Sequence, residues 1–317
     1  MKYTLTSLCL AALTLPALAA DTDPMEKLRE RLAEKLSAAK AHTTGDGMDL
    51  RVAAPPPAAA AAVAAHGSVK RVAHAPATTP AAPKRPAAAG HGGAAHWSYS
   101  GDAGPQTWGG LKPEFSMCTS GQRQSPIDIR EGIAVDLEPV KFDYQAGSFT
   151  VVDNGHTVQV NVAPGNSIEI NGKRFELKQF HFHRPSEERI DGRQFEMSAH
   201  LVHADAEGRL AVVGVLLAKG PVHPLVQTVW ANLPLEKNSE QRARVLLDPA
   251  ALLPTDRRYF TYMGSLTTPP CSEGVQWVVM RSPVAASPEQ IDIFSRLYPM
   301  NARPPQSAAG RRIMQSN

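Results

Sequence analysis

The sequence has few cysteines, little net charge and, beyond its first twenty residues, no long apolar run. Its 317 residues include three cysteines and carry a formal net charge of +3. A spanning helix needs roughly 18 or more uninterrupted apolar residues, and no later stretch reaches that length. We therefore expect no transmembrane segment in the mature chain. The small net charge gives no support to a nucleic-acid partner, and we expect none.

The first twenty residues predict a cleaved export signal, the signal peptide 1–20. Lys2 precedes an apolar run over residues 5–18, and small residues end the segment ahead of Asp21. The run is too short for a stable transmembrane helix. We expect a periplasmic protein, with secretion beyond the cell as the alternative.

Residues 21–50 and 51–95 differ in composition. In the first segment Asp23 can cap a helix that begins at Pro24, and an apolar stripe follows at helical spacing, formed by Met25, Leu28, Leu32 and Leu36. This amphipathic helical extension would lie on a cell surface or membrane interface, or associate weakly with itself. The second segment is rich in alanine and proline and has basic but no acidic residues, so we expect an extended basic linker. Attraction to an anionic cell surface is the alternative to a solvated spacer.

From residue 96 the sequence changes to short β-rich runs separated by turn residues. Strands are predicted at 141–144, 149–152, 157–162, 167–170, 176–183, 195–203, 210–217, 259–264 and 275–280, and helices at 221–231 and 288–297. Ser287 is expected to cap the second helix. The pattern indicates a β-dominated α+β domain over 96–303, with a large, mostly antiparallel central sheet and short peripheral helices. Residues 304–317 are predicted to be a flexible tail.

Three histidines carry most of the chemical information. His181 and His183 are two residues apart in a strand-like run, so both side chains leave the same sheet face and can reach one ion. His200 lies in the next strand-like run. Three neutral imidazoles with an open fourth position are a ligand set of catalytic zinc. His203 is an odd number of residues from His200, and on a regular strand it faces the opposite side.

A separate loop makes this pattern specific. Residues 264–273 read Gly-Ser-Leu-Thr-Thr-Pro-Pro-Cys-Ser-Glu, and the sequence resembles an α-class carbonic anhydrase, in which an His-x-His strand, a His-Leu-Val-His strand and this loop follow in the same order. Further matches are Gln-Ser-Pro-Ile-Asp at 124–128, Asn-Gly-His at 154–156, Pro-Ser-Glu at 185–187 and Trp277. The resemblance covers about residues 95–303. It implies a twisted central sheet, a Zn²⁺ cofactor, and reversible hydration of carbon dioxide to bicarbonate and a proton by zinc-bound hydroxide.

The resemblance also assigns residues around the metal. Thr267 would accept the hydroxide proton in a hydrogen bond and donate its own hydroxyl to Glu187, which aims the nucleophile. Carbon dioxide is apolar and needs a small dry pocket, for which the matching positions are Val202, Val212, Leu266, Thr268, Val275 and Trp277. The apolar members could equally be core residues, and Thr267 an ordinary loop hydroxyl.

His156 resembles the proton shuttle of the family. A cavity histidine with a pKa of about 6.5 can take a proton from zinc-bound water and pass it to buffer. The water path would be lined by Tyr99, Asn154 and Gln159. Because His156 directly follows an Asn-Gly turn, an idle exposed histidine is the alternative.

Two residues are expected to orient the ligand rings. Gln179 lies two residues before His181 and matches the family residue that holds that ring. Two residues before the third ligand the family has a glutamate, but Ser198 occupies this place. A serine hydroxyl can accept the N–H of His200 yet carries no charge. The departure therefore bears on zinc affinity more than on the reaction.

The cysteines favour one disulfide. Cys9 would leave with the signal, so the mature chain keeps Cys118 and Cys271 in an oxidising compartment. Bacterial members of the resembled family often carry a bridge between these two segments. Two unrelated buried thiols are the alternative.

Two other functions compete with this interpretation. The spacing of His181, His183 and Glu187 also fits the ligand pattern of a cupin-like metal oxygenase, with Glu187 as a metal ligand. The second half of the sequence lacks the His strand that a cupin needs. A non-catalytic carbonic-anhydrase-like binding module is the other rival, and it normally requires loss of a histidine ligand, whereas all three are present.

Overall fold

The computed structural model describes residues 96–317. The predicted signal peptide, helical extension and linker lie outside these residues, so those three remain predictions. Within the described part of the chain, no helix is long and apolar enough to cross a membrane.

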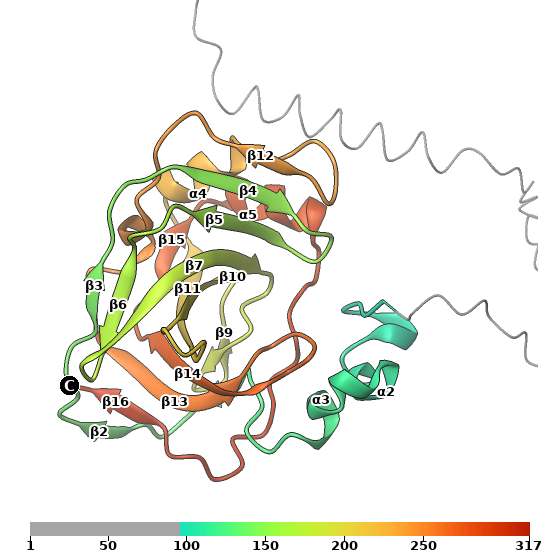
Figure 1. The fold of residues 1–317 in the computed structure, drawn as a ribbon, viewed down its shortest axis with the longest axis vertical. Helices are drawn as coiled ribbons and strands as arrows, with labels where there is room; N and C mark the ends of the chain where they lie inside the picture. The colour runs from blue at the N-terminus through green and yellow to red at the C-terminus, as the bar shows by residue number, and fades with distance from the viewer. Residues whose placement is uncertain (1–95) are drawn as a thin grey trace, which may run out of the picture.

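One large sheet of 13 strands forms the body of the described domain. Its main path, which runs from top to bottom in Figure 1, is β12 (Glu240–Arg242), β4 (Phe149–Asp153), β5 (Val158–Val162), β7 (Lys173–His183), β10 (Met197–Ala204), β11 (Leu210–Lys219), β14 (Glu273–Met280), β13 (Tyr259–Ser265), β16 (Met314–Ser316) and β2 (Ile133–Val135). Off this path, β3 (Lys141–Asp143) pairs with β6 (Ser167–Ile170), β6 also pairs with β7, and β15 (Val284–Ala286) pairs with β11. Most pairs are antiparallel; β11 with β14, β11 with β15 and β16 with β2 are parallel.

Short elements surround the sheet. They are β1 (Asp128–Ile129), β8 (Arg189–Ile190) and β9 (Arg193–Gln194) in a second small sheet, and the helices η1 (Gly101–Ala103), α2 (Trp108–Leu111), η2 (Pro113–Phe115), α3 (Met117–Ser120), α4 (Pro224–Trp230), η3 (Pro249–Leu252) and α5 (Pro288–Leu297). The predicted fold class, a β-dominated domain with short peripheral helices, is confirmed. Every predicted strand and both predicted helices overlap an observed element. Ser287 caps α5 in a reciprocal capping box with Gln290, as its sequence indicated.

The predicted flexible tail over 304–317 is wrong at its end. Residues 314–316 form β16, which pairs with β13 on one side and with β2 on the other. Met-Gln-Ser has no alternating apolar pattern, so its strand conformation comes from backbone pairing with two neighbours far away in sequence and not from local preference.

Strand alternation divides the two sides of the sheet and positions the site. Phe180 and Phe182 on β7, with Ala199 and Leu201 on β10, point into the main core, where Phe182 packs on Trp230 of α4. The residues between them, His181, His183 and His200, therefore leave the opposite face, beside a second apolar cluster that contains Val212 and Trp277.

Candidate active site

Three imidazoles meet on the open face of β7 and β10. His200 lies directly opposite His181 in the antiparallel ladder, and His183 is one side-chain repeat further along β7. The ring centroids are 4.9 Å apart for His181 and His183, 4.6 Å for His183 and His200, and 5.6 Å for His181 and His200. One nitrogen from each ring lies within 4.8 Å of the others. The predicted ligand set is thus brought together.

The hydrogen bonds decide which nitrogen each ring offers. Nδ1 of His181 donates to the side-chain oxygen of Gln179 at 2.9 Å, and Nδ1 of His183 donates to the carbonyl of Asn301 at 2.8 Å. In these two rings Nε2 keeps its lone pair. In His200 the two nitrogens have exchanged roles. Its Nε2 donates to Glu188 at 3.0 Å, so Nδ1 is the nitrogen that keeps its lone pair.

The residues present fit a zinc ion. Nε2 of His183 is buried and has no hydrogen-bond partner among the described residues, which is costly unless another group binds it. Burial lowers the pKa of His181 to about 3 and that of His183 well below its usual value, with a smaller contribution from His200. Both rings are therefore neutral, as zinc ligands must be. Among the described residues, the group of potential metal ligands consists of His181, His183 and His200 and contains no carboxylate.

His203 faces away from the three ligands, as expected from its odd spacing. Its Nδ1 donates to the carbonyl of Ala211 at 3.3 Å, and its Nε2 accepts the hydroxyl of Tyr144 at 2.7 Å. The register of β10 against β7 shifts between Val202 and His203, but the extra residue, Lys178, lies on β7. The alternation of β10 is therefore preserved.

Glu187 is buried beside the ligands and linked to the Thr-Thr-Pro-Pro loop. Its Oε1 accepts the backbone N–H of Arg303 at 2.7 Å, and the Thr267 side chain lies close enough to act on its pKa as a hydrogen-bonding neighbour, while Oε2 accepts no hydrogen bond among the described residues. Burial raises the pKa of Glu187 to about 7, against the opposing effects of His200 and of these hydrogen bonds. A dication on the neighbouring imidazoles would lower this pKa and keep the carboxylate an acceptor.

The expected partner of His200 is wrong. Ser198 does not accept the His200 N–H; its Oγ accepts the backbone N–H of Glu187 at 3.3 Å. Glu188 accepts the ring proton instead, from the loop that precedes β8. Strand periodicity cannot place a loop residue beside a strand, so this contact was missed. The absence of an acid at position 198 together with two consecutive acids at 187 and 188 was the signal available in the sequence.

The apolar residues expected to form the substrate pocket gather in one cluster. It contains Val212, Val275 and Trp277, with Val202 and Leu266 packed against it. Trp277 stands edge-on to His200 at 4.9 Å between ring centroids. Thr268 closes the turn of its loop by accepting the N–H of Cys271 at 2.9 Å. The apolar side chains therefore lie next to the third ligand.

His156 is stacked on an aromatic ring. Its ring lies 3.7 Å from that of Trp97 and 4.9 Å from that of His96, nearly parallel to both, and 6.5 Å edge-on from that of Tyr99. Burial, with smaller effects of His96 and Lys237, lowers the pKa of His156 to about 4. In this position the ring is a weak proton acceptor.

The other residues expected along the water path lie between His156 and the ligands. The side-chain amide of Asn154 donates to Gln159 at 3.3 Å, and Gln159 is directly opposite His181 on β5. Asn301 links the two ends, because its amide donates to the carbonyls of His156 and Phe182 while its own carbonyl accepts from His183.

The chain is similar to known proteins over nearly the whole of this domain. A family model described as eukaryotic-type carbonic anhydrase matches residues 103–317. The carbonic anhydrase of Pectobacterium carotovorum is 43% identical over 220 residues, which are 69% of this chain and 90% of that protein. This chain belongs to the α-class carbonic anhydrases. It is accordingly an enzyme of carbon dioxide hydration.

Solved carbonic anhydrases share the fold of this enzyme. One is a hyperthermostable carbonic anhydrase from an active hydrothermal vent chimney, with 45% identity and a TM-score of 0.69, covering 70% of this chain and 100% of its own. Another is the α-carbonic anhydrase of Thermovibrio ammonificans in complex with the inhibitor sulfanilamide, with 44% identity, a TM-score of 0.68 and the same coverage. The cupin-like oxygenase is therefore wrong as an alternative.

A disulfide joins Cys118 of α3 to Cys271 of this carbonic anhydrase's Thr-Thr-Pro-Pro loop, across 153 residues of sequence. Both cysteines are buried with Trp108 and Phe115 in a small apolar cluster. The bridge therefore ties the amino-terminal helices to the loop that carries Thr267.

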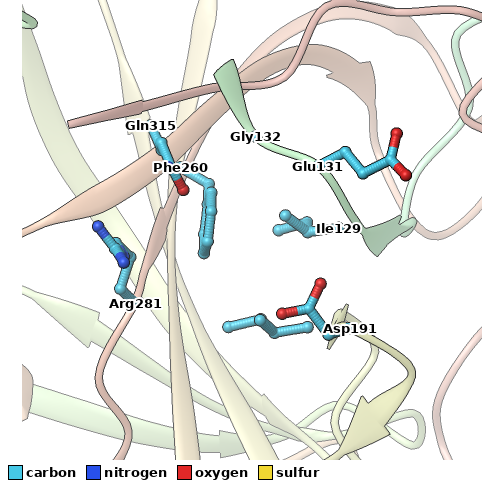
Figure 2. Close-up of a pocket in the computed structure, with 8 residues that line it drawn as sticks. Ile129, Glu131, Gly132, Asp191, Phe260, Arg281 and Gln315 are labelled. Atoms are coloured by element: carbon cyan, nitrogen blue, oxygen red, sulfur yellow. The ribbon is translucent and has the colours of Figure 1, made fainter. Parts of the chain in front are cut away.

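A separate hollow of the carbonic anhydrase lies away from the histidines. It has a volume of about 480 Å³ and is lined by Ile129, Glu131, Gly132, Ile190, Asp191, Phe260, Arg281 and Gln315. Figure 2 shows the carboxylates of Glu131 and Asp191 on one side of it and Arg281 with Phe260 on the other. None of the three ligands borders it.

Proposed function

We propose that this enzyme hydrates carbon dioxide at a zinc ion held by Nε2 of His181, Nε2 of His183 and Nδ1 of His200, and that His156 carries the released proton to buffer. The observation that carries the zinc assignment is the hydrogen-bond pattern of the three rings. Each ring has one nitrogen engaged by protein, and one nitrogen from each ring lies within 4.8 Å of the others.

Zinc at this point would supply Lewis-acid chemistry that makes water a nucleophile near neutral pH, an effect for which carbonic anhydrase is the standard example. The protein supplies orientation. Because ionised Glu187 can only accept, a hydrogen bond donated to it by the Thr267 hydroxyl would leave the lone pairs of Thr267 to accept a hydrogen bond from the nucleophile. Val212 and Trp277 exclude water on the side where an apolar substrate would lie.

Proton export requires His156 to leave its stacked position. A carrier with a pKa of about 4 holds almost no protons at neutral pH, whereas a hydrated imidazole has a pKa of about 6.5. Rotation away from Trp97 into water would restore the ordinary pKa. We therefore propose that Trp97 holds the resting position of the ring and that the water-exposed position carries the proton.

Replacement of His156 by alanine should lower kcat for hydration in weak buffer by about ten- to a hundredfold, near the lower end of the effect of general acid–base groups. The value of kcat/KM should stay nearly unchanged, because attack on carbon dioxide precedes proton export. Stopped-flow hydration over a range of imidazole concentrations measures both, and imidazole should restore the lost rate.

Trp97→Ala is the companion variant. It removes the stacking partner, so the pKa of His156 should rise toward its ordinary value, as followed by NMR titration of the ring. For the His156→Ala variant, an unchanged kcat would mean that His156 does not carry the proton. A parallel fall of kcat and kcat/KM would instead indicate damage to the pocket.

We also propose that the enzyme acts in the periplasm, with secretion as the alternative. The predicted signal at 1–20 and a disulfide between Cys118 and Cys271, which suits an oxidising compartment, support this location. The helical extension over residues 21–50 would contact the cell surface or mediate self-association.

A further inference from the structure

We propose that Glu188 is a positioning residue for His200, and that it supplies from a neighbouring loop the carboxylate that Ser198 lacks on the strand. The inference rests on the proposed zinc centre. It adds a residue that determines how firmly the ion is held.

The contact is direct and fully enclosed. Oε2 of Glu188 lies 3.0 Å from Nε2 of His200, and the two residues are 0% and 1% exposed. A charge-assisted hydrogen bond of this kind fixes the tautomer and the orientation of the ring, so that Nδ1 points to the position shared with His181 and His183.

The surrounding structure is shaped for this contact. The hydroxyl of Ser186 donates to the backbone carbonyl of Glu188 at 2.9 Å and accepts the N–H of Phe195 at 2.9 Å, which anchors the loop at the entry to β10. On β11, the residue opposite His200 is Gly214, and Cδ of Glu188 lies 3.9 Å from where a Cβ at 214 would stand. The carboxyl group therefore occupies the space beside a position without a side chain.

The energetics also point to a charged partner for Glu188. Its other oxygen, Oε1, is buried and has no hydrogen-bond partner among the described residues. A buried carboxylate that accepts a single hydrogen bond is costly unless positive charge lies close to it. A zinc ion bound through His200 would place that charge one ring away.

Ser198 cannot take this place. Its side chain is too short to carry a charge to the ring, and its Oγ already accepts the backbone N–H of Glu187. It lies two residues before His200, on the same face of β10, where a longer acid would reach the space that Glu188 now fills. In this enzyme the carboxylate that contacts His200 therefore comes from the loop before β8 and not from position 198 of β10.

An exchange of the two residues tests this inference. Zinc affinity is measured by competition with a chromophoric chelator for the parent enzyme, Glu188→Ser, Glu188→Gln, Ser198→Ala and the double variant Glu188→Ser with Ser198→Glu. Glu188→Ser should weaken binding about 10- to 100-fold, Glu188→Gln less, and Ser198→Ala not at all. The double variant, which keeps the same composition, should recover most of the loss.

Several results would overturn the inference. They are parental zinc affinity in Glu188→Ser and Glu188→Gln, an equal loss in Ser198→Ala, or a double variant that melts like the parent but binds zinc no better than Glu188→Ser. Glu188→Gln is nearly isosteric, so it reports the effect of the charge even if the serine variant fails to fold.

A second readout is independent of zinc. In the metal-free enzyme, the Nε2 proton of His200 should give a slowly exchanging NMR signal that Glu188→Ser abolishes and Ser198→Ala leaves in place. If the parent enzyme bound no zinc, the proposed function would be wrong. The His200 proton signal would still test the contact between Glu188 and His200. A signal unchanged in Glu188→Ser would contradict the contact itself.

Discussion

Replacement of His200 by alanine should leave the enzyme without stoichiometric zinc and reduce carbon dioxide hydration about a thousandfold or more. The His200 ring supplies one of the three ligands. A bound metal stabilises the transition state by several kcal/mol, and losing this stabilisation slows the reaction by at least about three powers of ten. Metal analysis after gel filtration and stopped-flow hydration measure the two effects.

His203→Gln is the matched control for this prediction. His203 is on the same strand but faces the main core, where it bonds to Ala211 and Tyr144. The substitution should reduce thermal stability and leave one zinc per chain. Retention of full zinc by His200→Ala, or its loss in His203→Gln, would contradict the ligand assignment.

Removal of the disulfide by Cys118→Ala with Cys271→Ala should destabilise the enzyme strongly. Closing a loop of 153 residues is worth up to roughly 5 kcal/mol in the chain-entropy model. For a domain of this size the melting temperature should fall by roughly 10 to 20 °C. Calorimetry of the oxidised parent, the reduced parent and the variant measures the change.

The reduced parent should melt near the double variant, because both lack the same covalent link. Zinc content should be retained in both, since neither cysteine belongs to the group of ligand residues. Two free thiols in freshly purified parent enzyme, or equal melting temperatures with and without reductant, would rule out a stabilising bridge.

Local pattern predicted much of the fold, and together with the family resemblance it predicted the three ligands. Strand alternation placed His181 and His183 on one face, paired His200 with them and turned His203 away, because parity in a strand is a strict geometric rule. The rule held along β10 and along β7 from Gln179 to His183, whereas the extra residue Lys178 breaks the alternation earlier on β7.

Contacts between segments distant in sequence could not be predicted from strand alternation. β16 has three residues and exists because β13 and β2 lie on either side of it. Glu188 reaches His200 from a loop, and no spacing rule connects loop residues with a strand. The stacking of His156 on Trp97, and the burial that lowers the pKa of His156 to about 4, likewise depend on how the amino-terminal segment packs.

The most direct test of the zinc mechanism is a titration of the metal-free enzyme with zinc while hydration of carbon dioxide is followed by stopped flow. Three rings with one nitrogen each within 4.8 Å of the others predict that activity is nearly absent without metal, rises linearly, and stops rising at one zinc per chain. Full activity in the metal-free enzyme, or binding of one zinc per chain without any gain in hydration, would contradict the account.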